Sequence, residues 1–420
     1  MLAVAAVVSG LALSGGAVGL VVPDAGPRTS EARARASLEC GKVVNSLRGS
    51  ATCPTPLAHI RPGAALRLEL PRGGHQPNDR RYPIVLRGAE GLLTSDSTRI
   101  PGLVAIADIA HGRVRAVPAD DPVAYLDRLD ERISENAYAR IRAALLLAGI
   151  LGALALVAPR AAVAGFVAVL AANLALGAAG VSAFWAVMTA IGLAAAVGGP
   201  LLARLPLVPL SIAVVAAYLG ALAAEGTWVA LSPLGPTQNG RFFGLSNALE
   251  TLLLVPALVG ASRRATFLPV GALAVVMVAG SSFGADGGGA VVLVVAYAIL
   301  AAGLFPLRLA VPAVASIAGA AALAIVLGPS THVTAAGSGA LLDRVRLSLD
   351  RLADHWVSAL VTALALAALA VLVWRGPRRL LPLAFAAAVA VSLVVNDSPS
   401  EVAVGGLVGY MTLARYDSAR

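Results

Sequence analysis

The chain alternates between long apolar runs and short polar connections. A helix needs about twenty mostly apolar residues to cross the roughly 30 Å of hydrocarbon in a bilayer. The pattern therefore predicts an all-α polytopic membrane protein with about eleven or twelve transmembrane helices. The expected spans are approximately 2–22, 141–158, 161–179, 181–201, 205–224, 245–262, 266–283, 288–306, 309–327, 357–374, 379–395 and 402–415, of which the last is short for a full span.

One long polar region interrupts this pattern near the front of the chain. Residues 24–138 are richer in Pro, Gly, Arg and Asp than anything later, which predicts a separate domain ahead of a membrane domain over 139–420. Residues 1–23 are expected to be a signal anchor or a signal peptide. Met1 is not followed by a positively charged segment, so whether this first run is cleaved stays open.

Composition supports a membrane location and argues against nucleic-acid binding. The sequence is 58% hydrophobic and only 13% charged, with a mean hydropathy of +0.82, which is not the composition of a water-soluble globule. The net charge of +9 comes from arginines that separate the apolar runs, not from a basic patch interleaved with aromatic residues. Lipid is therefore an expected partner and nucleic acid is not.

The arginines also predict the orientation of the spans. They gather on alternate connections, where Asp417 is the sole acid, whereas the opposite connections carry most of the acids. Because Arg and Lys in short loops favour the cytoplasmic side, we expect a multi-pass protein of a bacterial plasma membrane with 24–138 outside and the C-terminus in the cytoplasm. The basic set is Arg160, Arg204, Arg263, Arg264, Arg308, Arg375, Arg378, Arg379, Arg415 and Arg420; the acidic set is Glu225, Glu250, Asp286, Asp343, Asp350, Asp354, Asp397 and Glu401.

Two further features lie in the polar stretches. Cys40 and Cys53 both fall within 24–138, so they are a candidate disulfide in an oxidising compartment, although two cysteines can also stay reduced. Within 328–356, apolar residues recur at helical spacing opposite charged ones, which predicts an outer amphipathic helix near 338–356. This helix is expected to lie on the membrane interface or to pack on the protein's own loops.

Three polar motifs stand out, each at the start of a span that begins at the expected outer face. The first is Gly240–Gly244, which contains Arg241, followed by Asn247 and Glu250; the second is Gly284–Gly289, which contains Asp286; the third is Asn396, Asp397 and Ser398 with Glu401. Helix N-termini favour anions, and an arginine adds a bidentate donor, so the motifs together predict a site for phosphate or carboxylate. Their acids are candidates to hold a divalent cation, above all Asp286 and Asp397, or to act as acid or base.

Helix capping is the alternative explanation for the same motifs. Asn247 with Glu250, and Ser398 with Glu401, fit capping boxes, and Asp286 fits a cap over a glycine-rich turn. Capping leaves Arg241 unexplained. It also leaves the glycines after Asp286 unexplained, because glycine in a first turn lowers helix propensity and implies a close approach by another group, which a neighbouring helix can also supply. Asn173, within a span, is expected to form a helix–helix hydrogen bond.

The three motifs resemble those of an uncharacterised family of multi-spanning bacterial membrane proteins. The residues that match are Arg241, Phe242, Gly244 and Asn247; Gly284, Ala285, Asp286, Gly288 and Gly289; and Asn396, Asp397 and Ser398. Some members of that family carry an alkaline-phosphatase-like domain ahead of the spans, and residues 91–110 look like its closing strands. The resemblance implies a small α/β-like front domain. That domain is truncated here and lacks the metal-binding Asp/His set and the Ser or Thr nucleophile of a phosphatase.

These observations lead to one expected function and two rivals. We expect an outward-facing polar site that transports, flips or presents an anionic envelope substrate, such as a lipid-linked phosphate or glycan. The rivals are a membrane-embedded glycosyl- or phospho-transferase with a polyprenyl-phosphate-linked donor, and a non-catalytic envelope assembly scaffold. Whether the protein is an enzyme, which ion or metal it uses and its oligomeric state stay open.

Overall fold

The computed structural model places most of the chain in two compact units. One unit comprises residues 1–135 and 236–243, and the other comprises 136–235 and 244–420. The boundary falls inside the helix α4 (Pro122–Val157). The residues that the structure describes are 16–22, 43–45, 50–52, 66–68, 81–86, 89–96, 98–105, 108, 114–236, 243–327, 356–376, 378–396 and 399–418.

The first unit is built on a mixed six-stranded sheet. Strand β1 lies inside the sheet, antiparallel to β5 and parallel to β6 and β7, and the order along the sheet is β4-β5-β1-β6-β8. A separate pair, β2 and β3, is antiparallel. The strands are β1 (Ala17–Val22), β2 (Val43–Asn45), β3 (Ser50–Thr52), β4 (Leu66–Leu68), β5 (Tyr82–Leu86), β6 (Leu92–Ser95), β7 (Leu103–Ala105) and β8 (Val114–Val117).

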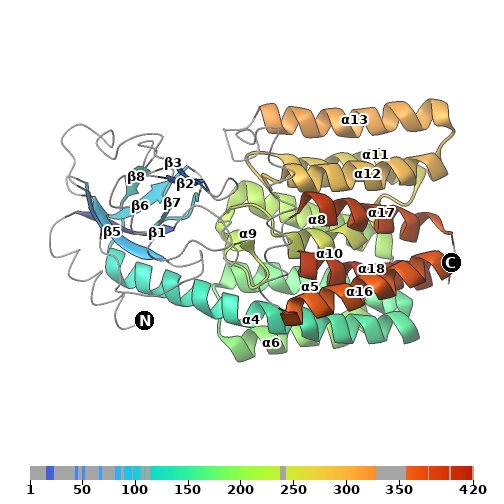
Figure 1. Cartoon of the computed structure of the whole chain (residues 1–420), viewed down its shortest axis with the longest axis horizontal. Helices are drawn as coiled ribbons and strands as arrows, with labels where there is room; N and C mark the ends of the chain where they lie inside the picture. The colour runs from blue at the N-terminus through green and yellow to red at the C-terminus, as the bar shows by residue number, and fades with distance from the viewer. Residues whose placement is uncertain are drawn as a thin grey trace. The chain divides into compact units, whose positions relative to one another are not determined.

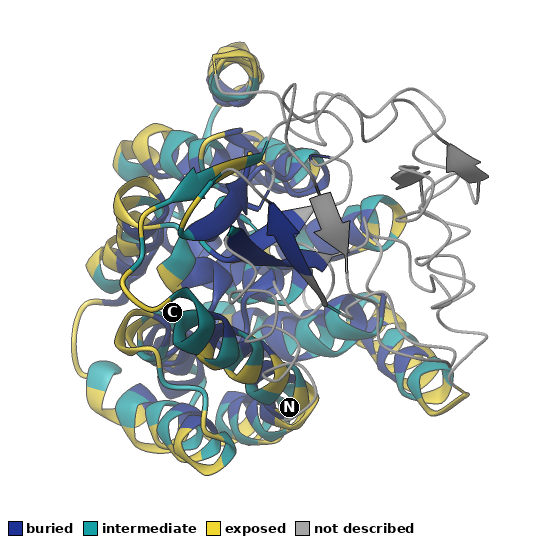
Figure 2. Cartoon of the chain, turned by 90° about the vertical axis from the view of Figure 1, so that its left-hand side faces the viewer, coloured by how far each residue is buried: buried dark blue, intermediate teal, exposed yellow. Residues whose placement is uncertain are grey.

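The sheet corrects the prediction of a transmembrane helix over 2–22. Residues 17–22 form β1, in which the residues from Ala17 to Val21 are buried, and Figure 2 shows dark blue, buried strands in the sheet. A strand buried on both faces reads as a continuous apolar run, so composition alone does not separate it from part of a span. Strands β6 and β7 fall within 91–110, the segment expected to hold the closing strands of the front domain.

Two arginine side chains connect segments of the first unit that are distant in the sequence. The Arg81 guanidinium pairs with Asp130 and donates to the Ser134 hydroxyl at 2.7 Å, which ties the start of β5 to α4. The Arg99 guanidinium lies 4.0 Å from the centre of the Phe243 ring, within cation–π range. Burial lowers the pKa of the Arg99 guanidinium from its ordinary value.

The second unit is a bundle of helices that lie side by side (Figure 1). Each of the eleven predicted runs from 141–158 onward coincides with a helix or with consecutive helical segments, and α4 begins earlier, at Pro122. After α4 these are α5 (Pro159–Ala179), α6 (Phe184–Leu193) continued through the π-turn η3 (Ala194–Gly198) into α7 (Gly199–Leu202), α8 (Leu207–Ala224), the short α9 (Thr227–Ala230), α10 (Asn247–Gly260), α11 (Arg264–Ala279), α12 (Gly287–Leu304), α13 (Leu307–Val326), α16 (Trp356–Arg375), α17 (Leu380–Val395) and α18 (Pro399–Ser418).

The lengths and composition of these helices are those of a multi-pass membrane protein. Among the described residues, seven helices are long and apolar enough to cross a bilayer. Three more are apolar but shorter, namely α10, α11 and α17. The helices differ in how far the rest of the protein covers them: the most apolar 18 residues of α5 are 67% buried, whereas those of α16 are only 17% buried.

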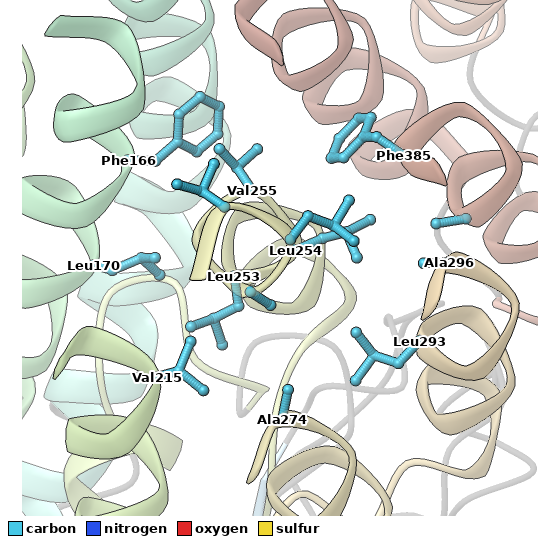
Figure 3. Close-up of a cluster of buried hydrophobic side chains, with 14 of the residues drawn as sticks. Phe166, Leu170, Val215, Leu253, Leu254, Val255, Ala274, Leu293, Ala296 and Phe385 are labelled. Atoms are coloured by element: carbon cyan, nitrogen blue, oxygen red, sulfur yellow. The ribbon is translucent and has the colours of Figure 1, made fainter. Parts of the chain in front are cut away.

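Helix α10 lies at the centre of the bundle. Figure 3 shows Leu253, Leu254 and Val255 pointing outward from α10 in different directions, toward side chains from α5, α8, α11, α12 and α17. Its residues from Leu253 to Gly260 are all buried. A helix that is apolar all round and enclosed on all sides is a core element, which makes the one acid on α10, Glu250, an unusual residue in its surroundings.

Candidate functional site

The turn between α11 and α12, which holds the second motif, folds back over the end of α11. The backbone N–H groups of Gly284 and Asp286 donate to the carbonyls of Met277 and Val278 at 2.8 and 2.9 Å. A Cβ on Gly284 would lie 2.5 Å from both carbonyl oxygens, so the turn needs glycine at this position. It thereby satisfies carbonyls that a helix end otherwise leaves without partners.

The first motif joins this turn through a second glycine. Gly244 has φ +86°, a conformation that favours glycine, and a Cβ there would overlap the carbonyl oxygen of Gly284. The next residue, Leu245, donates its N–H to the same oxygen at 3.4 Å. Two motifs separated by about forty residues in sequence are therefore in direct backbone contact.

The capping-box interpretation of Asn247 and Glu250 is wrong. Helix α10 is capped one residue earlier, by Ser246, whose hydroxyl accepts the N–H of Leu249 at 3.1 Å and donates to the Leu234 carbonyl at 2.6 Å. Leu249, and not Glu250, therefore occupies the position three residues after the cap. The Glu250 side chain instead extends to α12, where a Cβ on Gly289 would lie 2.6 Å from Oε2.

The capping interpretation of Asp286 is correct, and the third motif meets it at the same turn. Asp286 Oδ1 accepts the N–H of Gly289 at 2.9 Å, and the residue is fully buried. Asn396, which follows α17, donates from Nδ2 to the Ser392 hydroxyl at 2.8 Å. A Cβ on Gly288 would lie 2.9 Å from Asn396 Oδ1 and 3.2 Å from Asp286 Oδ1. Because Gly288 has no side chain, the polar groups of Asp286 and Asn396 can both lie close to the first turn of α12.

The first turn of α12 is consequently a meeting point of all three motifs. Glu250 comes from α10, Asp286 from the α12 N-cap and Asn396 from the end of α17, and each lies against Gly288 or Gly289. Asn247 is buried in the first turn of α10. The predicted site residues Arg241, Asp397 and Ser398, the candidate disulfide Cys40–Cys53 and the predicted amphipathic helix up to residue 355 lie outside the described residues.

Glu401, the remaining predicted residue, forms an ion pair that the sequence analysis missed. Its Oε2 lies 2.8 Å from an Nη atom of Arg140, whose side chain is only 4% exposed. The other Nη of Arg140 donates to the Gly235 carbonyl at 2.9 Å. One guanidinium therefore links the chain just before the first motif to the chain just after the third. The sequence did contain a signal for the burial of Arg140, because its spacing places it on the same helical face as Asn136 and Ala143.

The segment that Arg140 holds, 231–236, is buried although it is not helical. Asn136 donates to the Leu231 carbonyl at 3.0 Å, and Asn173 Oδ1 accepts the N–H of Leu234 at 3.0 Å. Asn173 also donates to the Tyr218 hydroxyl at 3.1 Å, which confirms the predicted helix–helix hydrogen bond. Irregular backbone among membrane helices needs such protein partners, because lipid supplies none.

A small cavity lies beside Glu250, between α10, α11, α12 and α17. Its volume is about 20 Å³, which suits roughly one water molecule and no organic ligand. Glu250, Thr251 and Ser392 form its polar side, and most of its remaining lining is aliphatic. In the described part of the chain, no three His, Cys, Asp or Glu residues are grouped as a metal site would require.

Comparison with protein-family models, curated proteins and solved structures finds no match for this chain. The resemblance carried by the three motifs therefore stays an expectation, and the site has to be interpreted from its own geometry.

Proposed function

We propose that this chain is an integral protein of a bacterial plasma membrane that transports, flips or presents an anionic envelope substrate, such as a lipid-linked phosphate or glycan. The observation that supports this proposal is the meeting of the three motifs at the first turn of α12. Gly288 and Gly289 give no side chains there, and Glu250 and Asn396 approach the space that a side chain would fill. Capping of α12 needs Asp286 alone, so it does not account for the other two residues.

The polar groups suit the substrate class in a specific way. A carboxylate accepts hydrogen bonds from the hydroxyls of a sugar, and a carboxamide both accepts and donates such bonds. Arg241, three residues before Gly244, is the proposed phosphate ligand, since a guanidinium binds phosphate through two parallel hydrogen bonds. Asp286 and Asp397 are the proposed ligands for a divalent cation that would bridge carboxylate and phosphate oxygens.

The charge distribution supports an outward-facing site. The connections that follow α4, α7, α10, α12 and α16 carry the arginines, and the three motifs belong to the opposite connections. Because basic short loops favour the cytoplasm, we place the motifs at the outer face.

Binding of a polyprenyl phosphate to the purified, full-length protein in detergent tests the proposal. We expect polyprenyl phosphate to raise the midpoint of thermal unfolding in a concentration-dependent manner, because a ligand that binds the folded state stabilises it. The neutral polyprenol should have a much smaller effect. Equal shifts with both lipids would refute an anionic substrate.

Two variants and one control locate the binding. With a glycosylated polyprenyl phosphate as the ligand, Glu250→Gln and Asn396→Ala should each raise the ligand concentration needed for the shift by about tenfold, as expected for the loss of one hydrogen bond to a sugar hydroxyl. The control is Glu225→Gln, because Glu225 is exposed after α8 and its Oε1 accepts a hydrogen bond from Thr227 at 2.5 Å, away from the motifs in sequence. A loss of binding in the control as large as in the variants would contradict a localised site.

A membrane-embedded transferase is the second candidate. Glu250 and Asp286 place two carboxylates beside one residue, Gly289, and paired carboxylates suit general acid–base chemistry. Release of polyprenyl phosphate from a glycosylated polyprenyl-phosphate donor by wild-type protein, and its loss in Asp286→Asn, would favour the transferase over a carrier.

A further inference from the structure

Helix α4 changes from polar to apolar at Arg142. Before that point it carries a charged residue every few positions, and from Ala143 to its end at Val157 it carries none. Of the two arginines at this boundary, Arg140 is buried and paired with Glu401, whereas Arg142 is exposed. The boundary is where a membrane helix passes from headgroups into hydrocarbon.

Aromatic side chains surround the Arg142 guanidinium. Its carbon atom lies 3.8 Å from the ring centre of Tyr138 and 6.0 Å from that of Phe184, at the start of α6. Phe184 in turn packs edge-on against Trp185, with ring centres 4.9 Å apart. We call Tyr138, Arg142, Phe184 and Trp185 the Arg142 patch. Tyr138 and Trp185 are 55% and 78% exposed, so the patch belongs to the outer surface of the bundle.

Arg142 keeps most of its hydrogen-bonding capacity. One Nη donates to the Tyr138 carbonyl at 2.7 Å, and within the described part of the chain Arg142 forms no ion pair. An arginine has five N–H donors, so the remaining donors of this exposed side chain can reach a ligand. At the other end of the bundle, by contrast, Arg160 donates to the carbonyls of Ala203 and Leu205 and so completes a helix end.

We propose that the Arg142 patch binds the phosphate of an anionic phospholipid in the leaflet at this end of the bundle. The positive charge complements the headgroup, and the Tyr138 and Phe184 rings hold the guanidinium by cation–π contact at headgroup depth. Exposed Trp185 and Tyr138 fit this depth because their rings combine an apolar body with a polar tip. This lipid site is independent of the function proposed for the first turn of α12.

Quenching of Trp185 by brominated lipids tests the proposal. Trp228→Phe, Trp356→Phe and Trp374→Phe together leave Trp185 as the single tryptophan in the full-length protein. The protein is placed in vesicles of equal parts phosphatidylglycerol and phosphatidylcholine, with one of the two brominated at a time. We expect phosphatidylglycerol to be enriched about fivefold over phosphatidylcholine beside Trp185, and Arg142→Gln to reduce that ratio to about one.

A control at the opposite end of the bundle makes the result specific. Arg308→Gln removes an exposed arginine from the first turn of α13 and should leave the ratio at Trp185 unchanged. Equal quenching by both lipids in the parent protein would overturn the proposal. So would a preference that persists in Arg142→Gln, because the charge of Arg142 is then not its source.

Discussion

Replacement of Gly289 by alanine tests whether the absence of a side chain at this position makes room for the Glu250 carboxylate. Alanine normally stabilises a helix by about 1 kcal/mol relative to glycine. At Gly289, however, the new Cβ would lie 2.6 Å from Glu250 Oε2 and 2.6 Å from Val278 Cγ1. Both contacts are too short, so both side chains, or the backbone of α12, have to move.

The two neighbours differ in how readily they move. Glu250 Oε2 is the end of a flexible side chain and can turn away, but Val278 is β-branched and has one strongly preferred rotamer on a helix. Overpacking of a core in this way costs about 1–3 kcal/mol. Set against the helix-propensity gain, the expected net destabilisation by Gly289→Ala is about 0–2 kcal/mol, together with displacement of the Glu250 carboxylate.

A double-mutant cycle isolates the contact with Glu250. Unfolding of the full-length protein by sodium dodecyl sulfate in mixed micelles, followed by circular dichroism, gives the free energy of unfolding of each variant. Glu250→Ala removes the carboxylate, so we expect Gly289→Ala to be less destabilising by about 1 kcal/mol in that background.

The matched control is Gly319→Ala on α13, where a Cβ would meet nothing within 4 Å. It should be neutral or stabilising. If Gly289→Ala stabilised the protein as much as Gly319→Ala does, or if the two changes at 250 and 289 were additive, the inferred contact between Glu250 and α12 would be wrong.

Three further predictions follow from the same contacts. Gly244→Ala should destabilise the protein by more than 2 kcal/mol in the same unfolding assay, because it combines a left-handed φ with overlap of the Gly284 carbonyl; a change below 0.5 kcal/mol would contradict the backbone contact. Arg140→Gln should cost about 3–5 kcal/mol because it leaves the Glu401 carboxylate without its buried partner, and recovery of most of that loss in Arg140→Gln/Glu401→Gln would confirm the pair, whereas additive losses would exclude it. Asn173→Ala should cost about 1–3 kcal/mol by the same measurement, since the Leu234 N–H and the Tyr218 hydroxyl lose a partner, and a neutral result would contradict the inference that Asn173 holds the segment 231–236 in place.

The sequence predicted the membrane helices well because their signal is local. An apolar run bounded by arginines or prolines has few alternatives to a helix in lipid, and the runs from 141–158 onward all proved helical. The exception, residues 17–22, has the same composition as those runs. Only the pairing with β5, β6 and β7 distinguishes it, and that pairing depends on residues far away in the chain.

The candidate site was predicted in part for a similar reason. The glycines after Asp286 indicated a close approach by some group, but the identity of that group depends on how α10 and α17 pack against α12. The cap of α10 was misplaced by one residue, because Ser246 and Asn247 are both good caps and only the hydrogen bond to Leu249 decides between them. Arg140 was missed because it lies between the polar region 24–138 and the predicted span 141–158, and it belongs to none of the three motifs.

The meeting of separate motifs at the first turn of α12 is tested most directly by cross-linking residue 288 to residue 396. The two native cysteines, Cys40 and Cys53, are first replaced by serine, and Gly288→Cys is combined with Asn396→Cys. A Cβ on residue 288 would lie 2.9 Å from Asn396 Oδ1, so oxidation with copper phenanthroline should join the two thiols in nearly all molecules. Gly319→Cys combined with Asn396→Cys, in contrast, should remain reduced. Failure of the 288–396 pair to cross-link in folded protein, under conditions that leave both thiols reactive to a maleimide, would contradict the account.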